Sequence, residues 1–197
     1  MSSARSRSSD RALSPALTAA ADRLVAAVRN VGASNPVILI DGRSGAGKST
    51  LARELVARWP LSGRVQLVAL DSLYPGWDGL MEGAVYARDQ ILRPHARGLI
   101  GVWQRWDWEA DARAEAHAVD PSLPLIVEGA GLLTPENARL GDVRVWVESP
   151  APSRQARALA RDGESFRPHW TRWAEQEERH LARNAPQERA TQVFLIP

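Results

Sequence analysis

Short apolar runs separated by amphipathic stretches set the pattern of this chain. Five runs are too short for helices and are bounded by Gly, Pro or a carboxylate, so each predicts a strand, and the first predicts a buried one. They lie at 36–41, 63–71, 124–129, 143–148 and 192–196. Apolar residues recur at helical spacing over 15–31 and 50–59, where Gly32 and Pro60 end the helices. Strands that alternate with helices predict an α/β fold, a parallel sheet covered by helices on both faces.

Two segments are longer than a crossover between parallel strands requires. Residues 72–123 separate two strands, where a crossover needs only about a dozen residues. This insert must hold helices or a small subdomain, and it contains half of the eight tryptophans. Residues 149–185 form the second such segment, in which five arginines follow in quick succession between 154 and 172. We predict a disordered tail over 1–14 and one domain over 15–197, with a helical acceptor-binding insert at 72–123 and an arginine-rich lid within 149–185.

The composition narrows the functional classes. The chain has 24 arginines and one lysine, Lys48, and its formal net charge is only +2. No run of basic residues with interleaved aromatics is present, so nucleic-acid binding is not expected. The absence of cysteine excludes a disulfide framework, and no apolar stretch is long enough for a membrane span or a signal peptide. These features favour a cytoplasmic protein that does not associate with membranes.

The single lysine lies in a phosphate-binding motif. The segment Gly42–Thr50 satisfies the pattern G-x-x-x-x-G-K-[ST] and stands between a predicted strand and a predicted helix. Its glycines let successive backbone N–H groups point at an anion, and the following helix adds its positive end. Lys48 should reach the β- and γ-phosphates of ATP, and the Ser49 hydroxyl should bind Mg²⁺. The residues expected at the nucleotide are Gly42, Ser44, Gly45, Ala46, Gly47, Lys48, Ser49 and Thr50.

Two carboxylates stand at the carboxyl ends of predicted strands. Asp71 follows the second strand and Glu128 ends the third, and ligands of open α/β sheets bind at that edge. Phosphoryl transfer needs one carboxylate for the proton of the acceptor hydroxyl and another group that organises magnesium. We assign the first role to Asp71 and the second to Glu128, which could also contact the substrate. The alternative is that either carboxylate caps a turn.

Further charged and aromatic residues are candidates for the site. Arg154, Arg157 and Arg161 fall on one helical face, which indicates either a lid over the phosphates or a solvated surface. Aromatic and acidic residues of the insert could bind the acceptor, although packing between Trp103 and Trp106 is an equal alternative. These candidates are Tyr74, Trp77, Asp78, Trp103, Trp106, Asp107, Trp108 and Glu109. The four histidines show no spacing typical of a metal site.

Taken together, these residues resemble the uridine kinase-like branch of the P-loop kinases, which includes relatives of phosphoribulokinase and pantothenate kinase. Apart from the phosphate loop, Asp71-Ser72-Leu73-Tyr74 is similar to that family's Asp-Ser-Phe-Tyr, whose Asp is the catalytic base. Ile126–Gly129 resembles its apolar-Glu-Gly strand, and 154–162 matches the arginine pattern of its lid helix. The resemblance extends from residue 36 to the end and implies a P-loop three-layer sandwich.

The chain also departs from that family. Arg105-Trp106-Asp107-Trp108-Glu109 stands where the family carries its uridine-recognition pattern, and Thr191 replaces a usual Asp. Uridine is therefore not implied as the substrate. The segment Asp71–Leu73 is similar as well to antibiotic-phosphorylating kinases of the chloramphenicol phosphotransferase type.

We expect an ATP- and Mg²⁺-dependent kinase that phosphorylates a hydroxyl of a small molecule, a nucleoside or a similar metabolite. One alternative is an antibiotic-modifying phosphotransferase, and another is a nucleotide-binding regulator without catalysis. The expected partner is the small-molecule acceptor, and a homodimer is left open.

Overall fold

The computed structural model describes residues 14–197, apart from the side chains of residues 162 and 164. The tail expected over 1–14 therefore lies outside the described residues, except for Ser14. The Ser14 hydroxyl accepts a hydrogen bond from Leu17 N at 3.3 Å and caps the first helix, α1 (Pro15–Arg29). Pro15 at the first helical position suits this start, because its missing N–H would have no partner inside the helix.

A five-stranded parallel sheet forms the centre of the molecule, as the apolar runs predict. Its order is β2-β5-β1-β6-β7. The strands are β2 (Gln66–Ala69), β5 (Leu125–Glu128), β1 (Val37–Gly42), β6 (Val143–Glu148) and β7 (Gln192–Leu195). The second run yields a shorter strand than expected, because Leu70–Ser72 turns into a 3-10 helix. Asp71 consequently lies in the turn after β2.

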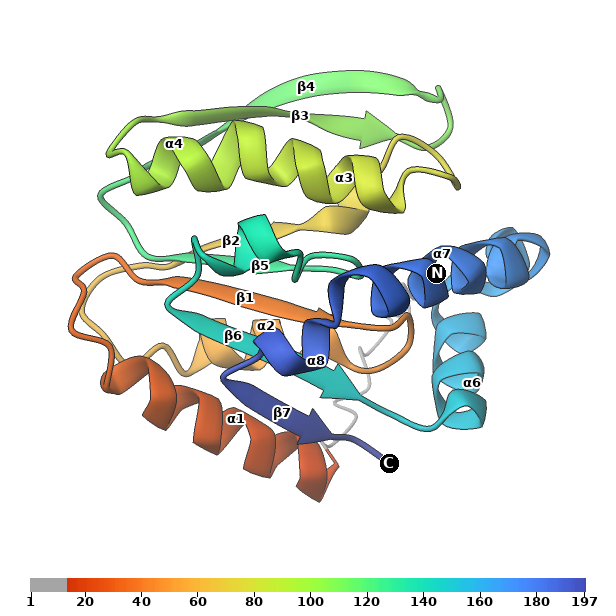
Figure 1. Ribbon diagram of the computed structural model, residues 1–197, viewed down its shortest axis with the longest axis horizontal. Coiled ribbons are helices and arrows are strands. Elements are labelled where there is room, and N and C mark those ends of the chain that lie inside the picture. Colours follow the sequence, from red (N-terminus) through yellow and green to blue (C-terminus); the bar gives the residue numbers. More distant parts are fainter. Residues whose placement is uncertain (1–13) are drawn as a thin grey trace, which may run out of the picture.

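Alternating residues of the buried strands supply two hydrophobic cores, one on each face of the sheet. On β1, Val37 and Leu39 belong to one core, while Ile38 and Ile40 belong to the other. The second core is covered by α1 and α2 (Lys48–Ala57), which pack side by side. The first is covered by the insert and by α7 (Trp170–Asn184). These layers confirm the expected α/β fold with helices on both faces (Figure 1).

The insert is only partly helical, which corrects the sequence-based expectation. Its first half holds α3 (Leu80–Ala87), a π-helical turn (Arg88–Leu92) and α4 (Arg93–Ala96). Its second half is an antiparallel hairpin of β3 (Gly101–Asp107) and β4 (Ala112–Val119), at the top of Figure 1. Alanines alternate with larger residues along β4, a period of two that indicates a strand. The helix propensity of alanine competes with that signal.

The second long segment lies at the carboxyl ends of the strands. It contains α6 (Ala151–Asp162), two short 3-10 turns and α7, and the arrowheads of β6 and β7 point toward α6 in Figure 1. Two short helices complete the fold, α5 (Pro135–Ala138) and α8 (Pro186–Arg189). None of the helices in the described part of the chain combines the length and apolar character needed to cross a bilayer.

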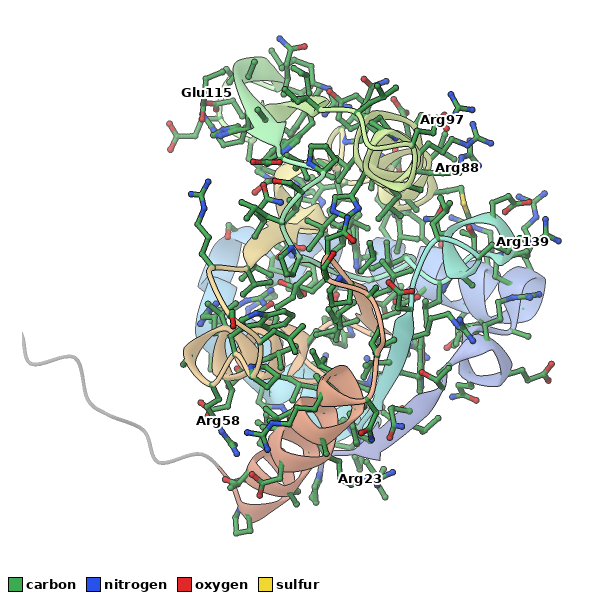
Figure 2. All side chains as sticks on the ribbon, turned by 90° about the vertical axis from the view of Figure 1, so that its left-hand side faces the viewer. Arg23, Arg58, Arg88, Arg97, Glu115 and Arg139 are labelled. Carbon is green, nitrogen blue, oxygen red and sulfur yellow. The ribbon has the colours of Figure 1, made fainter. Side chains whose placement is uncertain are left out.

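Arginine serves as a general surface cation in this fold. Figure 2 views the molecule from the end opposite the strand arrowheads, and its labelled arginines project outward from separate elements. They come from α1, the end of α2, the π-helical turn, the end of α4 and the end of α5, and are Arg23, Arg58, Arg88, Arg97 and Arg139. The single lysine, in contrast, is 9% exposed.

Candidate active site

Sheet topology brings the main sequence candidates to one edge. Glu128 ends β5 and is aligned with Ile40 of β1 on one side and with Ala69 of β2 on the other. The phosphate loop follows β1 directly, and Asp71 follows β2. Because parallel strands end at the same edge, the loop and both carboxylates lie on the same side of the molecule. This is the juxtaposition that the sequence predicts.

The phosphate loop depends on glycine at positions where other residues are strained or excluded. Gly45 has φ +77°, and a Cβ there would lie 2.1 Å from Arg154 O. Gly47 has φ +107° and stands at the N-cap of α2 without a side-chain cap. The first N–H groups of α2 are thus free of a side-chain cap and can serve an anion.

A cavity of about 520 Å³ opens against this loop, and we call it the phosphate cavity. It is bounded by the loop and α2 on one side and by α6 on the other. No acidic residue is among its lining residues, so the charged side chains of the cavity are all positive. The lining residues are Gly45, Gly47, Lys48, Ser49, Thr50, Arg53, Ala156, Arg157, Ala158, Ala160 and Arg161. Backbone donors, an ammonium group and guanidinium groups fit the phosphates of a nucleotide.

Glu128 joins the phosphate loop electrostatically to Asp71. The Ser49 hydroxyl lies close enough to the Glu128 carboxylate to lower its pKa. Burial raises the pKa of Glu128, the nearby Lys48 ammonium lowers it, and the negative charge of Asp71 raises it. The charges of Lys48 and Asp71 therefore both act on Glu128 at this edge. The Lys48 ammonium itself donates to Arg43 O at 3.1 Å.

The Ser49 and Glu128 oxygens fit a magnesium ion. Mg²⁺ prefers oxygen ligands and is usually held by one or two protein groups together with phosphate oxygens and water. No group of three or more His, Cys, Asp or Glu side chains with metal-binding geometry occurs among the described residues. A site that relies on phosphate oxygens does not require such a group.

Two of the three arginines of α6 bind the phosphate loop itself. Arg154 is 4% exposed, and its guanidinium donates to Ser149 O at 3.1 Å and to Ser44 O at 3.3 Å. Arg157 donates to Gly45 O at 2.8 Å and to Pro197 O at 2.7 Å. Burial lowers the pKa of both guanidinium groups. These bonds hold loop carbonyls in place.

A second cavity, of about 560 Å³, lies next to the first, and we call it the aromatic cavity. Six of its eleven lining residues carry rings. The eleven are Ser44, Asp71, Tyr74, Trp77, Trp108, Glu109, Arg161, Ser165, Phe166, His169 and Trp173. Arg161 lines both cavities, and Ser44 of the phosphate loop lines this one. The two cavities therefore meet at Arg161 and at the loop.

Trp77 is the centre of the ring cluster. His169 stacks on it with ring centroids 4.2 Å apart, and Trp108 lies at 4.8 Å and Phe166 at 5.5 Å. Trp108 also donates its indole N–H to Asp71 O at 3.0 Å, which ties the hairpin tip to the turn that carries the carboxylate. The Asp71 residue is exposed at the cavity wall. The arrangement places a solvent-accessible carboxylate beside a ring-lined space.

Tyr74 forms the buried floor of this cavity. It is 1% exposed, and its hydroxyl donates to Ala130 O at 2.8 Å. Burial and, to a smaller degree, the charge of Asp71 raise the pKa of Tyr74 well above its usual value. The ring therefore stays neutral and supports the wall of the cavity.

Four candidates of the insert do not line the aromatic cavity, and neither does Glu128. Asp78 is exposed and pairs with Arg172. Asp107 accepts from the N–H groups of Glu109 and Ala110 at 3.0 Å, so it stabilises the hairpin turn.

Trp103 and Trp106 are the other two insert candidates outside the cavity, and the Trp106 ring lies 5.4 Å from the Arg113 guanidinium. The alternative of helical packing between Trp103 and Trp106 is wrong, because both residues belong to β3. Trp103 stacks on His117 instead, with ring centroids 4.5 Å apart.

Sequence reasoning missed the part of the site that follows α6. Phe166, His169 and Trp173 line the aromatic cavity, and their spacing of three and four residues was visible as a signal. His169 is thus a residue of the cavity wall, although its type and isolation suggested a core or surface position. Also missed were Asp41 and Glu177, two buried acids that bind the backbone of the phosphate loop.

Comparisons with known proteins agree with this architecture. No protein-family model and no curated protein sequence matches the chain. A solved structure of a possible uridine kinase from Bacillus stearothermophilus aligns with a TM-score of 0.68 and 21% identity over 90% of this chain and 98% of that one. A proposed fructose transport system kinase from Silicibacter sp. TM1040 aligns with a TM-score of 0.56 and 20% identity, over 94% of this chain and 100% of that one.

These identities establish the fold alone. The resemblance seen in the motifs is confirmed at that level: the chain has the α/β fold shared by P-loop kinases of the uridine kinase type.

Proposed function

We propose that this protein is an ATP- and Mg²⁺-dependent phosphotransferase that phosphorylates a hydroxyl group of a small molecule, a nucleoside or a similar ring-bearing metabolite. One observation carries the proposal. A cationic cavity built on a phosphate loop meets a ring-lined cavity at Arg161, and the second cavity holds the exposed carboxylate of Asp71. Phosphate donor and acceptor can therefore occupy adjacent spaces.

The residues divide the chemistry between them. Lys48 and the backbone N–H groups of the loop hold the β- and γ-phosphates of ATP, while Arg161 balances charge where the cavities meet. Asp71 accepts the proton of the acceptor hydroxyl. The oxygen of that hydroxyl bonds to the γ-phosphorus, and the bond from that phosphorus to ADP breaks, so that ADP leaves. Ser49 and Glu128 would hold Mg²⁺, which supplies positive charge to the phosphate oxygens.

The first test is the variant Asp71→Asn. It removes the proton acceptor but keeps the shape of the side chain, so transfer should fall by about 10² to 10⁴ fold. ADP affinity, measured by calorimetry, should stay within about twofold of the unchanged protein, since Asp71 lies outside the phosphate cavity. Turnover close to that of the unchanged protein would disprove the role of Asp71 as the base.

A second candidate is an enzyme that phosphorylates an aromatic natural product such as an antibiotic. The six rings of the aromatic cavity favour it, because flat apolar groups stack on such walls. ADP release measured against nucleosides, aryl alcohols and sugars separates the candidates. Stimulation by nucleosides supports the first, and stimulation by aryl alcohols alone supports the second. Release that no acceptor stimulates would favour a nucleotide-binding regulator.

A further inference from the structure

Helix α7 lines the aromatic cavity and contacts the phosphate loop through neighbouring side chains. It lies beside α6 at the carboxyl edge of the sheet (Figure 1). Gln176, Glu177 and His180 are all buried on its inner side. Each of them makes polar contacts with a different segment of the candidate active site.

Glu177 binds the phosphate loop. One carboxylate oxygen accepts from Ser44 N at 2.6 Å, and the other accepts from Arg43 Nε at 3.0 Å. The side chain is 4% exposed, so these charge-assisted bonds are shielded from water. Ser44 also lines the aromatic cavity, so a shift of Ser44 changes both the phosphate loop and the wall of that cavity.

Gln176 binds the segment that carries Trp77. Its amide nitrogen donates to Trp77 O at 2.7 Å, and its amide oxygen accepts from Leu80 N at 3.3 Å. One turn earlier, Trp173 contributes its own ring to the aromatic cavity and meets Tyr74 edge-on at 4.9 Å. The position of α7 therefore fixes much of the ring cluster.

His180 adds a third anchor at the start of the loop. Its Nε2 lies 2.9 Å from Asp41 Oδ2, and its Nδ1 lies 2.9 Å from the Asn184 amide. Asp41 in turn accepts from Gly42 N at 2.6 Å. The helix thus contacts the phosphate loop at two places and the Trp77 segment at another, within little more than one turn.

We infer that Glu177 and Gln176 are positioning residues that couple nucleotide binding to the arrangement of the aromatic cavity. A helix is rigid along one turn, so a shift of the loop that moves Glu177 also moves Gln176 and the Trp77 backbone. Coupling of this kind is reciprocal, and each ligand then changes the affinity for the other by the same factor. The inference rests on the proposed function in taking a nucleotide as the ligand of the loop.

Trp77 itself can report the coupling. The protein is labelled with 5-fluorotryptophan, its ¹⁹F NMR spectrum is recorded during an ADP titration, and Trp77→Phe assigns the Trp77 signal. We expect that signal to shift in proportion to ADP occupancy. Gln176→Leu removes the amide hydrogen bonds to Trp77 O and Leu80 N, so ADP affinity should stay within about twofold while the Trp77 shift falls to less than about half.

Glu177→Gln provides the complementary test. It keeps an acceptor for Ser44 N but removes the negative charge that Arg43 requires, so ADP affinity should fall about tenfold. Glu175→Gln is the matched control, since Glu175 is exposed on the same helix, and it should leave both readouts unchanged. If Gln176→Leu does not fold, Gln176→Glu replaces it, because it keeps the acceptor for Leu80 N and loses the donor to Trp77 O.

The outcomes separate this inference from the proposed function. Failure of the unchanged protein to bind ADP would remove the proposed function. Normal ADP binding without a response at Trp77, or an unchanged response in Gln176→Leu, would overturn the coupling alone. An equal loss of ADP affinity in Glu175→Gln would also overturn it, since the effect would then not depend on the contact with the loop.

Discussion

The phosphate cavity and the aromatic cavity are nearly equal in volume, at about 520 and 560 Å³, but they are built differently. The first is formed largely by backbone and by side chains of one nine-residue motif, closed by α6. The second is formed by side chains from the turn after β2, the hairpin tip, the 3-10 turns and α7. The phosphate cavity offers a fixed arrangement of positive charges and N–H groups, whereas the aromatic cavity offers the surfaces of aromatic rings.

Under the proposed function, the phosphate cavity therefore determines the type of reaction, and the aromatic cavity determines the substrate. Phosphates are met by N–H groups whose direction follows from glycine conformations, so few alternatives exist for the loop. Most walls of the aromatic cavity come from segments outside the loop, so exchange of one ring leaves the groups that line the phosphate cavity in place. A variant that spares the contacts of Glu177 and Gln176 should therefore change mainly the step of its own cavity.

Among variants that compare the two cavities, Lys48→Met in the phosphate cavity should have the largest effect. The substitution removes the ammonium group proposed to contact the transferring phosphate, so we expect a loss of about 10³ fold in turnover, measured by ADP release. Binding of the acceptor should persist, since Lys48 does not line the aromatic cavity. If acceptor binding were lost in parallel, the two cavities would not be separate.

A smaller effect is expected from Trp77→Leu in the aromatic cavity. Loss of the central ring should raise the KM for the acceptor by about thirtyfold, equivalent to about 2 kcal/mol, and ADP affinity should remain unchanged. Trp77→Phe retains a ring and should recover most of the affinity. Equal KM values for the Leu and Phe variants would show that stacking is not the source of binding.

The floor of the aromatic cavity gives a pH-dependent prediction. Because burial raises the pKa of Tyr74, the native protein keeps the phenol proton above pH 10, whereas the unfolded chain releases it. This contribution to stability is complete below the unfolded pKa and is lost as the pH rises. The free energy of unfolding should fall by up to about 1.4 kcal/mol per pH unit above pH 10, measured with guanidinium. Tyr74→Phe should lack this slope, and an identical slope would refute the prediction.

The smallest effect is expected from Asp78→Asn, outside both cavities. The Arg172 guanidinium lowers the pKa of Asp78, but the pair is exposed to solvent, and such pairs contribute little. The thermal midpoint should change by less than about 2 °C, and kcat and KM by less than about twofold. A raised acceptor KM would restore the role in substrate binding that the sequence suggested for Asp78.

The fold follows from the sequence because its signals are local. Each of the five strands is a short apolar run with a clear boundary, and the phosphate loop is a contiguous motif. The hairpin was not predicted, because alanines along β4 favour a helix while their alternation favours a strand. Pairing with β3 settles that conflict, and pairing is a tertiary contact.

The site could be predicted only where strand ends fix it. Asp71, Lys48 and Glu128 lie at one edge because parallel strands end there, a rule that requires no knowledge of side-chain packing. Asp78 lies only one residue beyond Trp77, yet it points to Arg172 and away from the rings. The contribution of His169 depends on the path of the chain after α6, and the spacing of Phe166, His169 and Trp173 indicates a shared face without giving that path.

The bond from the Trp108 indole to Asp71 O has a consequence for altering the acceptor. The same tryptophan is a wall of the aromatic cavity and a clamp on the turn that presents the carboxylate. Redesign of the hairpin tip for a different molecule would therefore also release the backbone of residue 71. A successful change of specificity would have to replace the clamp as well as the wall.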